Sequence, residues 1–304
     1  MFKLLPNWLS SIISKIYLLD YIYEIRIRLN KPIMINYRGK YEKLIDCSNY
    51  NSKTVYANNE LINFIITVAT KQSIYAYNEE IKHCYIQAES GIRIGVCGTV
   101  VYNNGKILTI KNITSLNIRI AHQVLNCSEK IIDFIYSNKI VKNTLIVSPP
   151  GQGKTTMIRD IVYKLSDEKE VDNILVVDER FEIAGGGDKE LKIGNLTDII
   201  SGCEKSIAFD ETIKTMTPSV IVTDEISTNN DLSSIRQAIR SGVKVIATAH
   251  ASGVNDLKNK KYFDEIIKEK CFERFIVLSN RNGVGTIDGV FDECLRVLYV
   301  PYLQ

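Results

Sequence analysis

The sequence predicts an α/β protein: a C-terminal part built on a parallel β-sheet, preceded by a smaller α+β domain. Two observations lead to this prediction. The C-terminal half alternates helical stretches with short continuous apolar runs, as expected of strands covered on both faces; the runs are TLIVS, NILVVD, SVIVTDE and VKVIATAH. The N-terminal half instead combines short β-branched strands with turn residues, which favours antiparallel pairing.

The chain has 304 residues, which is enough for about two domains. We expect an N-terminal domain over residues 1–125, a connector helix and hinge over residues 126–142, and the parallel-sheet domain over residues 143–304. Asn126 and Glu129 have the spacing of a helix-capping pair, so the connector helix would begin there and end near Asn138. No Pro/Gly/Ser-rich linker separates the halves, which favours a short hinge over a flexible tether.

The first segment of the chain is predicted to be an amphipathic helix. Trp8, Ile12, Ile16 and Leu19 recur at helical spacing, and such a stripe usually faces the core, with membrane contact as the less favoured alternative. Polar residues interrupt the segment before about 18 apolar residues accumulate. We therefore expect neither a membrane-spanning helix nor a secretory signal here.

The remaining elements follow from local patterns. Asn104-Gly105 lies between apolar runs and predicts a hairpin turn. Further N-terminal elements are expected as two strands within 23–37, a helix over 60–71, and strands over 83–88, 91–101, 107–110 and 115–121. The segments 273–279, 283–289 and 294–301 contain strand patterns separated by glycine turns and predict an antiparallel edge of the C-terminal sheet.

Composition narrows the class of protein. The chain has 45% hydrophobic and 24% charged residues, a composition that excludes disordered and collagen-like chains.

The two halves of the chain differ in charge. Residues 1–140 carry 17 basic and 10 acidic side chains, and the remaining residues carry 21 and 25, so the halves have net charges of +7 and −4. The basic half could contact phosphates, anionic lipids or an acidic subunit, although a solvated mixed surface is an equal alternative. Seven scattered cysteines without a C-x-x-C pair indicate reduced thiols and a cytosolic protein.

The most specific motif is SPPGQGKTT, which follows the strand TLIV and precedes a helical stretch. Gly151 and Gly153 allow the backbone N–H groups to surround a triphosphate. Lys154 would place its ammonium between the β and γ phosphates, and Thr155 would offer its hydroxyl to Mg²⁺. Ser148 stands where the usual pattern has glycine, and it is small enough for the loop to close. The predicted ATP-binding residues are Ser148, Pro149, Pro150, Gly151, Gln152, Gly153, Lys154, Thr155 and Thr156.

A second motif is the apolar strand from Val220 that ends in two carboxylates. Asp224 is predicted to hold the water shell of Mg²⁺, together with Thr155 on the metal. Glu225 is predicted to orient or deprotonate the water that attacks the γ phosphate. Alone, this ending would be an ordinary strand end, but the phosphate loop upstream favours the catalytic interpretation.

Two further strand ends can contribute, because ligands of open α/β sheets lie at the carboxyl edge. Glu179, in the acidic segment 177–182, could support the metal or the water, and a solvated acidic loop is nearly as favoured. His250 could sense the γ phosphate, with a structural histidine as the alternative. The histidines at 83, 122 and 250 lack metal-ligand spacing, and Ala184–Gly187 is interpreted as a loop.

These segments, together with EIRIRLNKP, SGIRIGVCG, GNLTDIISGCEK and SLNIRIA, closely resemble the stage III sporulation protein AA family over nearly the whole chain. That family is similar to the ring-forming ATPases of type II and type IV secretion systems and pilus motors. In this comparison SPPGQGKTT, VVDERFEIAG, TPSVIVTDEI and VKVIATAH resemble the phosphate loop, aspartate box, Walker B strand and histidine box. The resemblance implies that the parallel-sheet domain is a RecA-like P-loop NTPase domain.

The resemblance further implies a cytoplasmic motor of the mother cell that forms a homohexameric ring. The ring would use ATP to energise or gate a channel toward the forespore. Its partners would be membrane-embedded sporulation channel proteins, which could give it a peripheral membrane location. Arg93 and Arg119 resemble arginines that such motors present to the nucleotide, whereas surface ion pairs are the alternative for strand arginines. Ser227 departs from the glycine that is common in the family.

Two other functions use the same pocket. A nucleotide-binding scaffold of the channel base would hydrolyse little ATP and would not need Glu225 as a base. A DNA-translocating motor would need a cationic groove or stacked aromatic residues, and only Tyr75 and Tyr77 lie near the basic half in a suggestive arrangement. We therefore expect no stable nucleic-acid partner.

Overall fold

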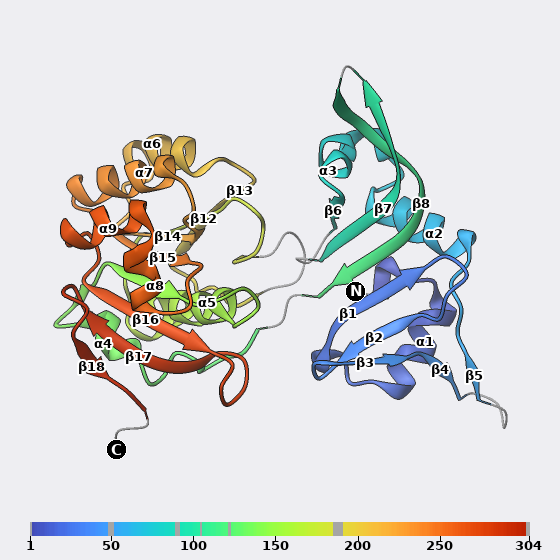
Figure 1. Ribbon diagram of the computed structural model, residues 1–304, viewed down its shortest axis with the longest axis horizontal. Coiled ribbons are helices and arrows are strands. Elements are labelled where there is room, and N and C mark those ends of the chain that lie inside the picture. The colour runs from blue at the N-terminus through green and yellow to red at the C-terminus, as the bar shows by residue number, and fades with distance from the viewer. Residues whose placement is uncertain are drawn as a thin grey trace. The chain divides into compact units, whose positions relative to one another are not determined.

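The computed structural model describes residues 2–47, 52–88, 92–103, 105–120, 123–184 and 191–301. These residues form two compact units, here called the first unit (residues up to 120) and the second unit (residues 123–184 and 191–301) (Figure 1). Several positions with sequence-based expectations lie outside the described residues: Gly91, Asn104, Ala121, His122 and residues 185–187.

The first unit is a six-stranded antiparallel sheet with the order β3-β2-β1-β8-β7-β6. The sheet and its helices share one hydrophobic cluster. Its strands are β1 Ile22–Arg28, β2 Met34–Tyr37, β3 Lys40–Lys43, β6 Tyr85–Gln87, β7 Arg93–Asn103 and β8 Lys106–Arg119, with a separate pair β4 Ile45–Asp46 and β5 Lys53–Thr54. Its helices are α1 Asn7–Ile16, α2 Asn59–Ala69 and α3 Asn78–Lys82, and short 3₁₀ turns are η1 Phe2–Leu4, η2 Leu19–Tyr21 and η3 Ile74–Tyr77.

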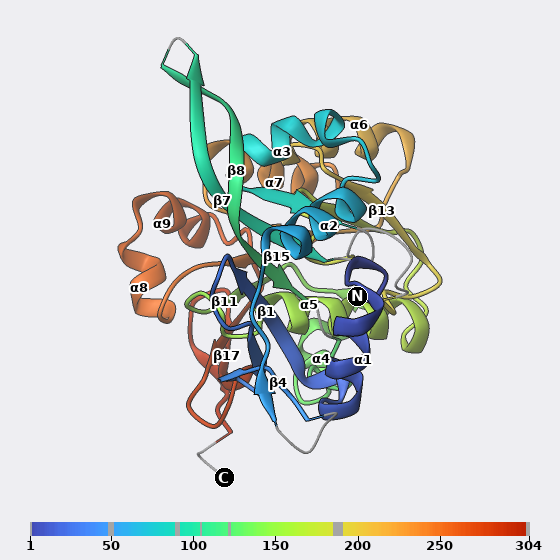
Figure 2. The ribbon, with the colours of Figure 1, turned by 90° about the vertical axis from the view of Figure 1, so that its right-hand side faces the viewer.

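Strand β8 combines two strands that the sequence predicts separately. Its pairing with β7 shifts register between Cys97 and Thr99, and Asn112 on β8 has a φ of 49°. At Gly98 a Cβ would lie 2.7 Å from the carbonyl oxygen of Lys111, so only glycine allows the strands to approach here. The irregularity bends the hairpin without ending it, and Figures 1 and 2 show this long hairpin projecting from its sheet.

The predicted N-terminal helix is present, but its buried face differs from the expected stripe. Leu9 and Ile13 are fully buried, whereas Trp8 is 49% and Ile16 41% exposed. The apolar face of this helix is wider than the part of it that packs against the rest of the unit. Helical spacing alone therefore predicted burial for apolar residues that lie at the exposed side of this face. Within the described ranges, no helix is both long and apolar enough to cross a membrane.

The second unit contains an eight-stranded sheet with the order β13-β12-β14-β15-β11-β16-β17-β18. The strands from β13 to β16 are parallel, and β17 and β18 add an antiparallel edge, as the sequence predicts. The bounds are β11 Thr144–Val147, β12 Ile174–Asp178, β13 Thr197–Ser201, β14 Val220–Glu225, β15 Lys244–Ala249, β16 Arg274–Ser279, β17 Thr286–Asp292 and β18 Val297–Tyr299.

Helices cover both faces of this sheet (Figure 1). Leu145 and Val147 point into one hydrophobic cluster and Ile146 into the other, because successive strand residues alternate between faces. The helices of the first cluster are α6 Lys205–Thr215, α7 Asn229–Arg240, α8 Val254–Asn259 and α9 Lys261–Lys268. Those of the second are α4 Ile132–Ile135, α5 Lys154–Tyr163 and the π-helical turn η4 Lys164–Glu168.

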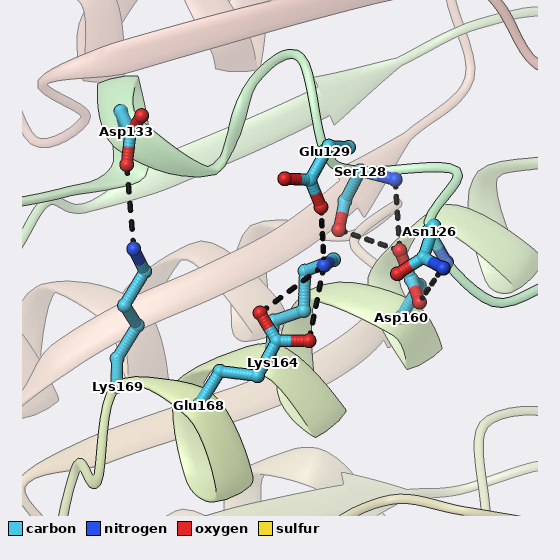
Figure 3. Close-up of polar contacts among 8 residues, drawn as sticks. All are labelled: Asn126, Ser128, Glu129, Asp133, Asp160, Lys164, Glu168 and Lys169. Atoms are coloured by element: carbon cyan, nitrogen blue, oxygen red, sulfur yellow. Dashed lines mark hydrogen bonds and ion pairs between the residues drawn. The ribbon is translucent and has the colours of Figure 1, made fainter.

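The connector helix expected over residues 126–138 is wrong in extent, because α4 covers only four residues and the short strands β9 Tyr136–Ser137 and β10 Ile140–Val141 follow it. Figure 3 shows why. Asp160 on α5 accepts hydrogen bonds from Asn126 N at 2.9 Å, Ser128 N at 2.8 Å and Ser128 Oγ at 2.6 Å. Glu129, expected as a capping residue, pairs instead with the buried Lys164. Tertiary contacts with α5 therefore replace the local helix.

We expect Asp160→Asn to lower the free energy of unfolding by about 2–3 kcal/mol, because a fully buried acceptor of three hydrogen bonds becomes partly a donor. Urea unfolding followed by circular dichroism measures the change. Asp133→Asn is the matched control, since this carboxylate is 84% exposed and pairs with Lys169 at 3.4 Å, a contact worth about 0–1 kcal/mol. Equal losses in the two variants would contradict the anchoring role of Asp160.

Candidate functional site

The loop predicted to hold phosphates connects the central strand β11 to the first residue of α5. Gly151 and Gly153 have φ values of 73° and 87°, which L side chains rarely adopt. At Gly153 a Cβ would also lie 3.1 Å from Gly285 Cα. The two glycines thus give this loop a conformation in which α5 begins with its positive end facing the loop.

The neighbouring loop residues fit the same geometry. Ser148 is fully buried, and its hydroxyl donates to Pro149 O at 2.9 Å, so serine is accommodated in place of glycine. Thr155 and Thr156 lie in the first turn of α5. The Gln152 Oε1 atom is buried and accepts no hydrogen bond from the described residues, which leaves an unused acceptor in the loop.

Lys154 is folded back over this loop. Its Nζ donates to Ser148 O at 3.0 Å, Pro149 O at 3.3 Å and His250 Nδ1 at 2.7 Å, and the residue is only 7% exposed. Burial lowers the pKa of Lys154 to about 8, although the carboxylates of Glu225 and Glu182 partly oppose this. The ammonium faces neutral acceptors at contact distance, an arrangement that an anion would improve.

His250 connects Lys154 to Glu225. Because an ammonium only donates hydrogen bonds, Nδ1 of His250 is the acceptor, and the ring proton lies on Nε2. That atom is 2.8 Å from Glu225 Oε2. Lys154 and His250 follow the strands β11 and β15, and Glu225 is the last residue of β14. These three strands are neighbours in the sheet, so their carboxyl ends bring the three side chains together.

Asp224 and Glu179 share a cation that the sequence did not reveal. Lys205 Nζ lies 2.6 Å from Asp224 Oδ1 and 2.6 Å from Glu179 Oε2. The contact to Asp224 is an ion pair between two buried side chains. Burial raises the pKa of Asp224 to about 6, and Lys205 acts in the opposite direction.

These residues fit ATP and Mg²⁺. A loop with two left-handed glycines and a central buried ammonium suits a polyphosphate. Thr155 and Asp224 carry the hard oxygen ligands that Mg²⁺ prefers, and the metal usually takes its remaining ligands from phosphates and water. The described part of the chain contains no group of three or more His, Cys, Asp or Glu residues arranged to hold a metal.

The acidic segment after β12 divides into two roles. Asp178 is fully buried and accepts from the N–H groups of Glu182 at 2.7 Å, Ile183 at 3.1 Å and Ala184 at 2.8 Å. Asp178 therefore anchors the loop through its carboxylate. Glu179 instead faces Lys205.

Lys205 was missed because β13 was not predicted as a strand. This edge strand has mixed burial and lacks a continuous apolar run. Lys205 follows its carboxyl end by four residues, so the carboxyl-edge rule that selected Glu179 and His250 would also have selected Lys205 once β13 was recognised.

Arg93 and Arg119 belong to the first unit, where they lie opposite each other on β7 and β8. Arg93 is stacked over the ring of Tyr85, with 4.2 Å between the guanidinium carbon and the ring centroid. Glu24 of β1 is the other cross-strand neighbour of Arg119. The sheet thus gathers two cations at one place, and their action on a nucleotide stays a prediction.

Comparisons with known proteins agree with this architecture. Stage III sporulation protein AA of Bacillus subtilis (strain 168) is 33% identical over 306 residues, which cover 97% of this chain and 95% of the relative. Among solved structures, the Yersinia pseudotuberculosis ATPase DotB has a TM-score of 0.64 at 13% identity and covers 95% of this chain and 80% of its own. The pilus retraction motor PilT with bound ADP has a TM-score of 0.58 at 13% identity, with coverages of 84% and 74%.

At such low identity the two solved structures establish the fold alone: a RecA-like P-loop domain preceded by a smaller N-terminal domain. The family resemblance inferred from the sequence motifs is confirmed independently. The model of the family described as "Sporulation stage III, protein AA" matches residues 2–298. The chain therefore belongs to the Sporulation stage III, protein AA family.

Proposed function

We propose that this chain is a Mg²⁺-dependent ATPase that uses ATP hydrolysis to energise or gate a sporulation channel. One observation carries the proposal: a single imidazole, that of His250, joins the Lys154 ammonium to the Glu225 carboxylate at 2.7 and 2.8 Å. The candidate phosphate-binding cation and the candidate base therefore face the same loop. The family membership and the ATPase fold support the same activity.

In this proposal each residue has a defined task. The loop Ser148–Thr156 binds the phosphates, with Lys154 moving from the loop carbonyls to the β and γ phosphates. Thr155 and Asp224 would hold Mg²⁺, which would supply positive charge to the phosphate oxygens. Glu225 Oε1 or Oε2 takes the proton of the attacking water, and His250 orients that carboxylate through Nε2.

The proposal extends to assembly and place. We infer a homohexameric ring in which Arg93 and Arg119 of one subunit stabilise charge on the nucleotide of its neighbour. The ring would act on the mother-cell side of a channel between mother cell and forespore. Membrane-embedded channel proteins would be its partners and would hold it peripherally at the membrane. Cargo transport would then follow from ATP-driven movement of the ring.

The test is phosphate release measured against protein concentration, with molar mass determined by light scattering at each point. If arginines act between subunits, activity per mole should rise at least about tenfold as the ring forms, because these cations contribute only there. Constant activity per mole across that range would contradict action between subunits. ATP binding without phosphate release in the assembled state would favour the structural scaffold.

A further inference from the structure

The Lys205 ammonium lies between two carboxylates of the candidate site, where a divalent metal ion could also bind. Lys205 is the first residue of α6 and is only 5% exposed. Its Nζ lies 2.6 Å from an oxygen of Asp224 and 2.6 Å from an oxygen of Glu179. Asp224 lies near the carboxyl end of β14, Glu179 directly follows β12, and Lys205 follows β13 by four residues. Because these three strands are adjacent in the sheet, their order brings the three residues together.

The buried Asp224 and the carboxylate of Glu179 converge on one point, and the Lys205 ammonium lies at that point. Two carboxylates that face the same point repel each other, and a positive charge between them offsets this repulsion. Two oxygens at 2.6 Å from one point are near the distances at which carboxylates bind divalent cations, which are about 2.0–2.6 Å. Without Lys205, the same point would present two carboxylates to a metal ion.

We propose that Lys205 is a positioning residue whose ammonium occupies the metal position while no nucleotide is bound. In the nucleotide-free protein its ammonium holds Asp224 and excludes free Mg²⁺. With ATP bound, the phosphates would supply further oxygen ligands for a metal. Asp224 would then be free to hold that metal, while Lys205 keeps its ion pair with Glu179. The inference rests on the proposed ATP site, and it makes metal binding conditional on nucleotide binding.

The experiment uses the full chain without nucleotide and MgCl₂ as the probe, with binding measured by calorimetry and thermal unfolding. The wild type should show no heat and no change in Tm. Lys205→Met should bind Mg²⁺ on the order of tenfold or more tightly than the wild type, because a competing charge at the site is gone, and its Tm should rise with MgCl₂. Adding Asp224→Asn to Lys205→Met should abolish this response.

Lys164→Met is the matched control. Lys164 is a buried lysine of the second unit with two carboxylate partners, Glu129 and Glu168, and its loss should leave the response to MgCl₂ at the wild-type level. Lys205→Arg should restore the wild-type behaviour. If Lys205→Met does not fold, Lys205→Gln gives the same comparison without the charge.

The outcomes separate the two proposals. An identical response of the wild type and the neutral Lys205 variants to MgCl₂ would overturn the role of Lys205. ATP titrated in the presence of EDTA tests the loop by itself, and Lys205→Met should bind this metal-free ATP as the wild type does. Absence of ATP binding in both proteins would refute the proposed function, while the comparison in MgCl₂ would still decide whether Lys205 excludes the metal.

Discussion

Replacing Glu225 by glutamine should slow phosphate release by at least about 10²-fold, the typical contribution of a positioned base, and should change ATP affinity by less than about threefold. The amide oxygen can still accept the hydrogen bond from His250 Nε2, so the connection to Lys154 is retained. Only the capacity to accept a proton is lost. Phosphate release at saturating ATP and calorimetric ATP binding measure the two quantities separately.

Two substitutions make this result specific. Glu211→Gln changes an exposed glutamate of α6 and should leave both quantities unchanged. Glu179→Gln removes a carboxylate that is already paired with Lys205 at 2.6 Å and should reduce the rate less than Glu225→Gln. If Glu225→Gln released phosphate normally while Glu179→Gln did not, Glu179 would be the base.

The parallel sheet, apart from its edge strand β13, was predictable because the strands covered on both faces leave a local pattern. Ile146 contacts one hydrophobic cluster while Leu145 and Val147 contact the other, so a strand buried on both faces is a nearly continuous apolar run. The phosphate loop was predictable for a similar reason. Gly151 and Gly153 take left-handed φ values that the loop itself requires.

Features that depend on distant partners were not predictable in the same way. The segment after Asn126 has the composition of a helix start, but Asp160 lies 34 residues further along the chain and takes its backbone N–H. The pairing of Lys205 with Asp224 likewise depends on the neighbouring positions of β13 and β14 relative to β12. Local propensity is a weak prior where such contacts compete with it.

The position of His250 was predictable from the local sequence, but its contacts were not. The sequence placed it at a strand end and left two interpretations, a phosphate sensor or a structural histidine. The order β14-β15-β11 decides its neighbours, since β15 lies between the strands that lead to Glu225 and Lys154. Only the sheet order, which the sequence does not encode locally, makes His250 the residue between the other two.

Lys154→Met should weaken ATP binding by at least about 30-fold, because a desolvated ammonium hydrogen-bonded to phosphate is a charge-assisted contact whose loss costs about 2–5 kcal/mol. Calorimetry with ATP and Mg²⁺ measures the loss. The structure also predicts the effect on the empty protein. Burial already lowers the pKa of Lys154 to about 8, so the charge is unfavourable there, and methionine should keep or increase the free energy of unfolding without ATP.

Lys164→Met is the control for removing a buried lysine. We expect the reverse of the pattern for Lys154→Met, namely a change in the free energy of unfolding without a change in ATP binding. Burial alone would lower the pKa of Lys164, but hydrogen bonds to Glu129 and Glu168 raise it above its usual value, so its charge is favourable in the folded state. Its loss should therefore lower the free energy of unfolding in urea and leave ATP binding intact. If Lys154→Met instead destabilised the empty protein as much as Lys164→Met does, its ammonium would be a structural partner of Ser148 and His250. The Lys154 ammonium would then serve the structure of the loop and not the binding of an anion.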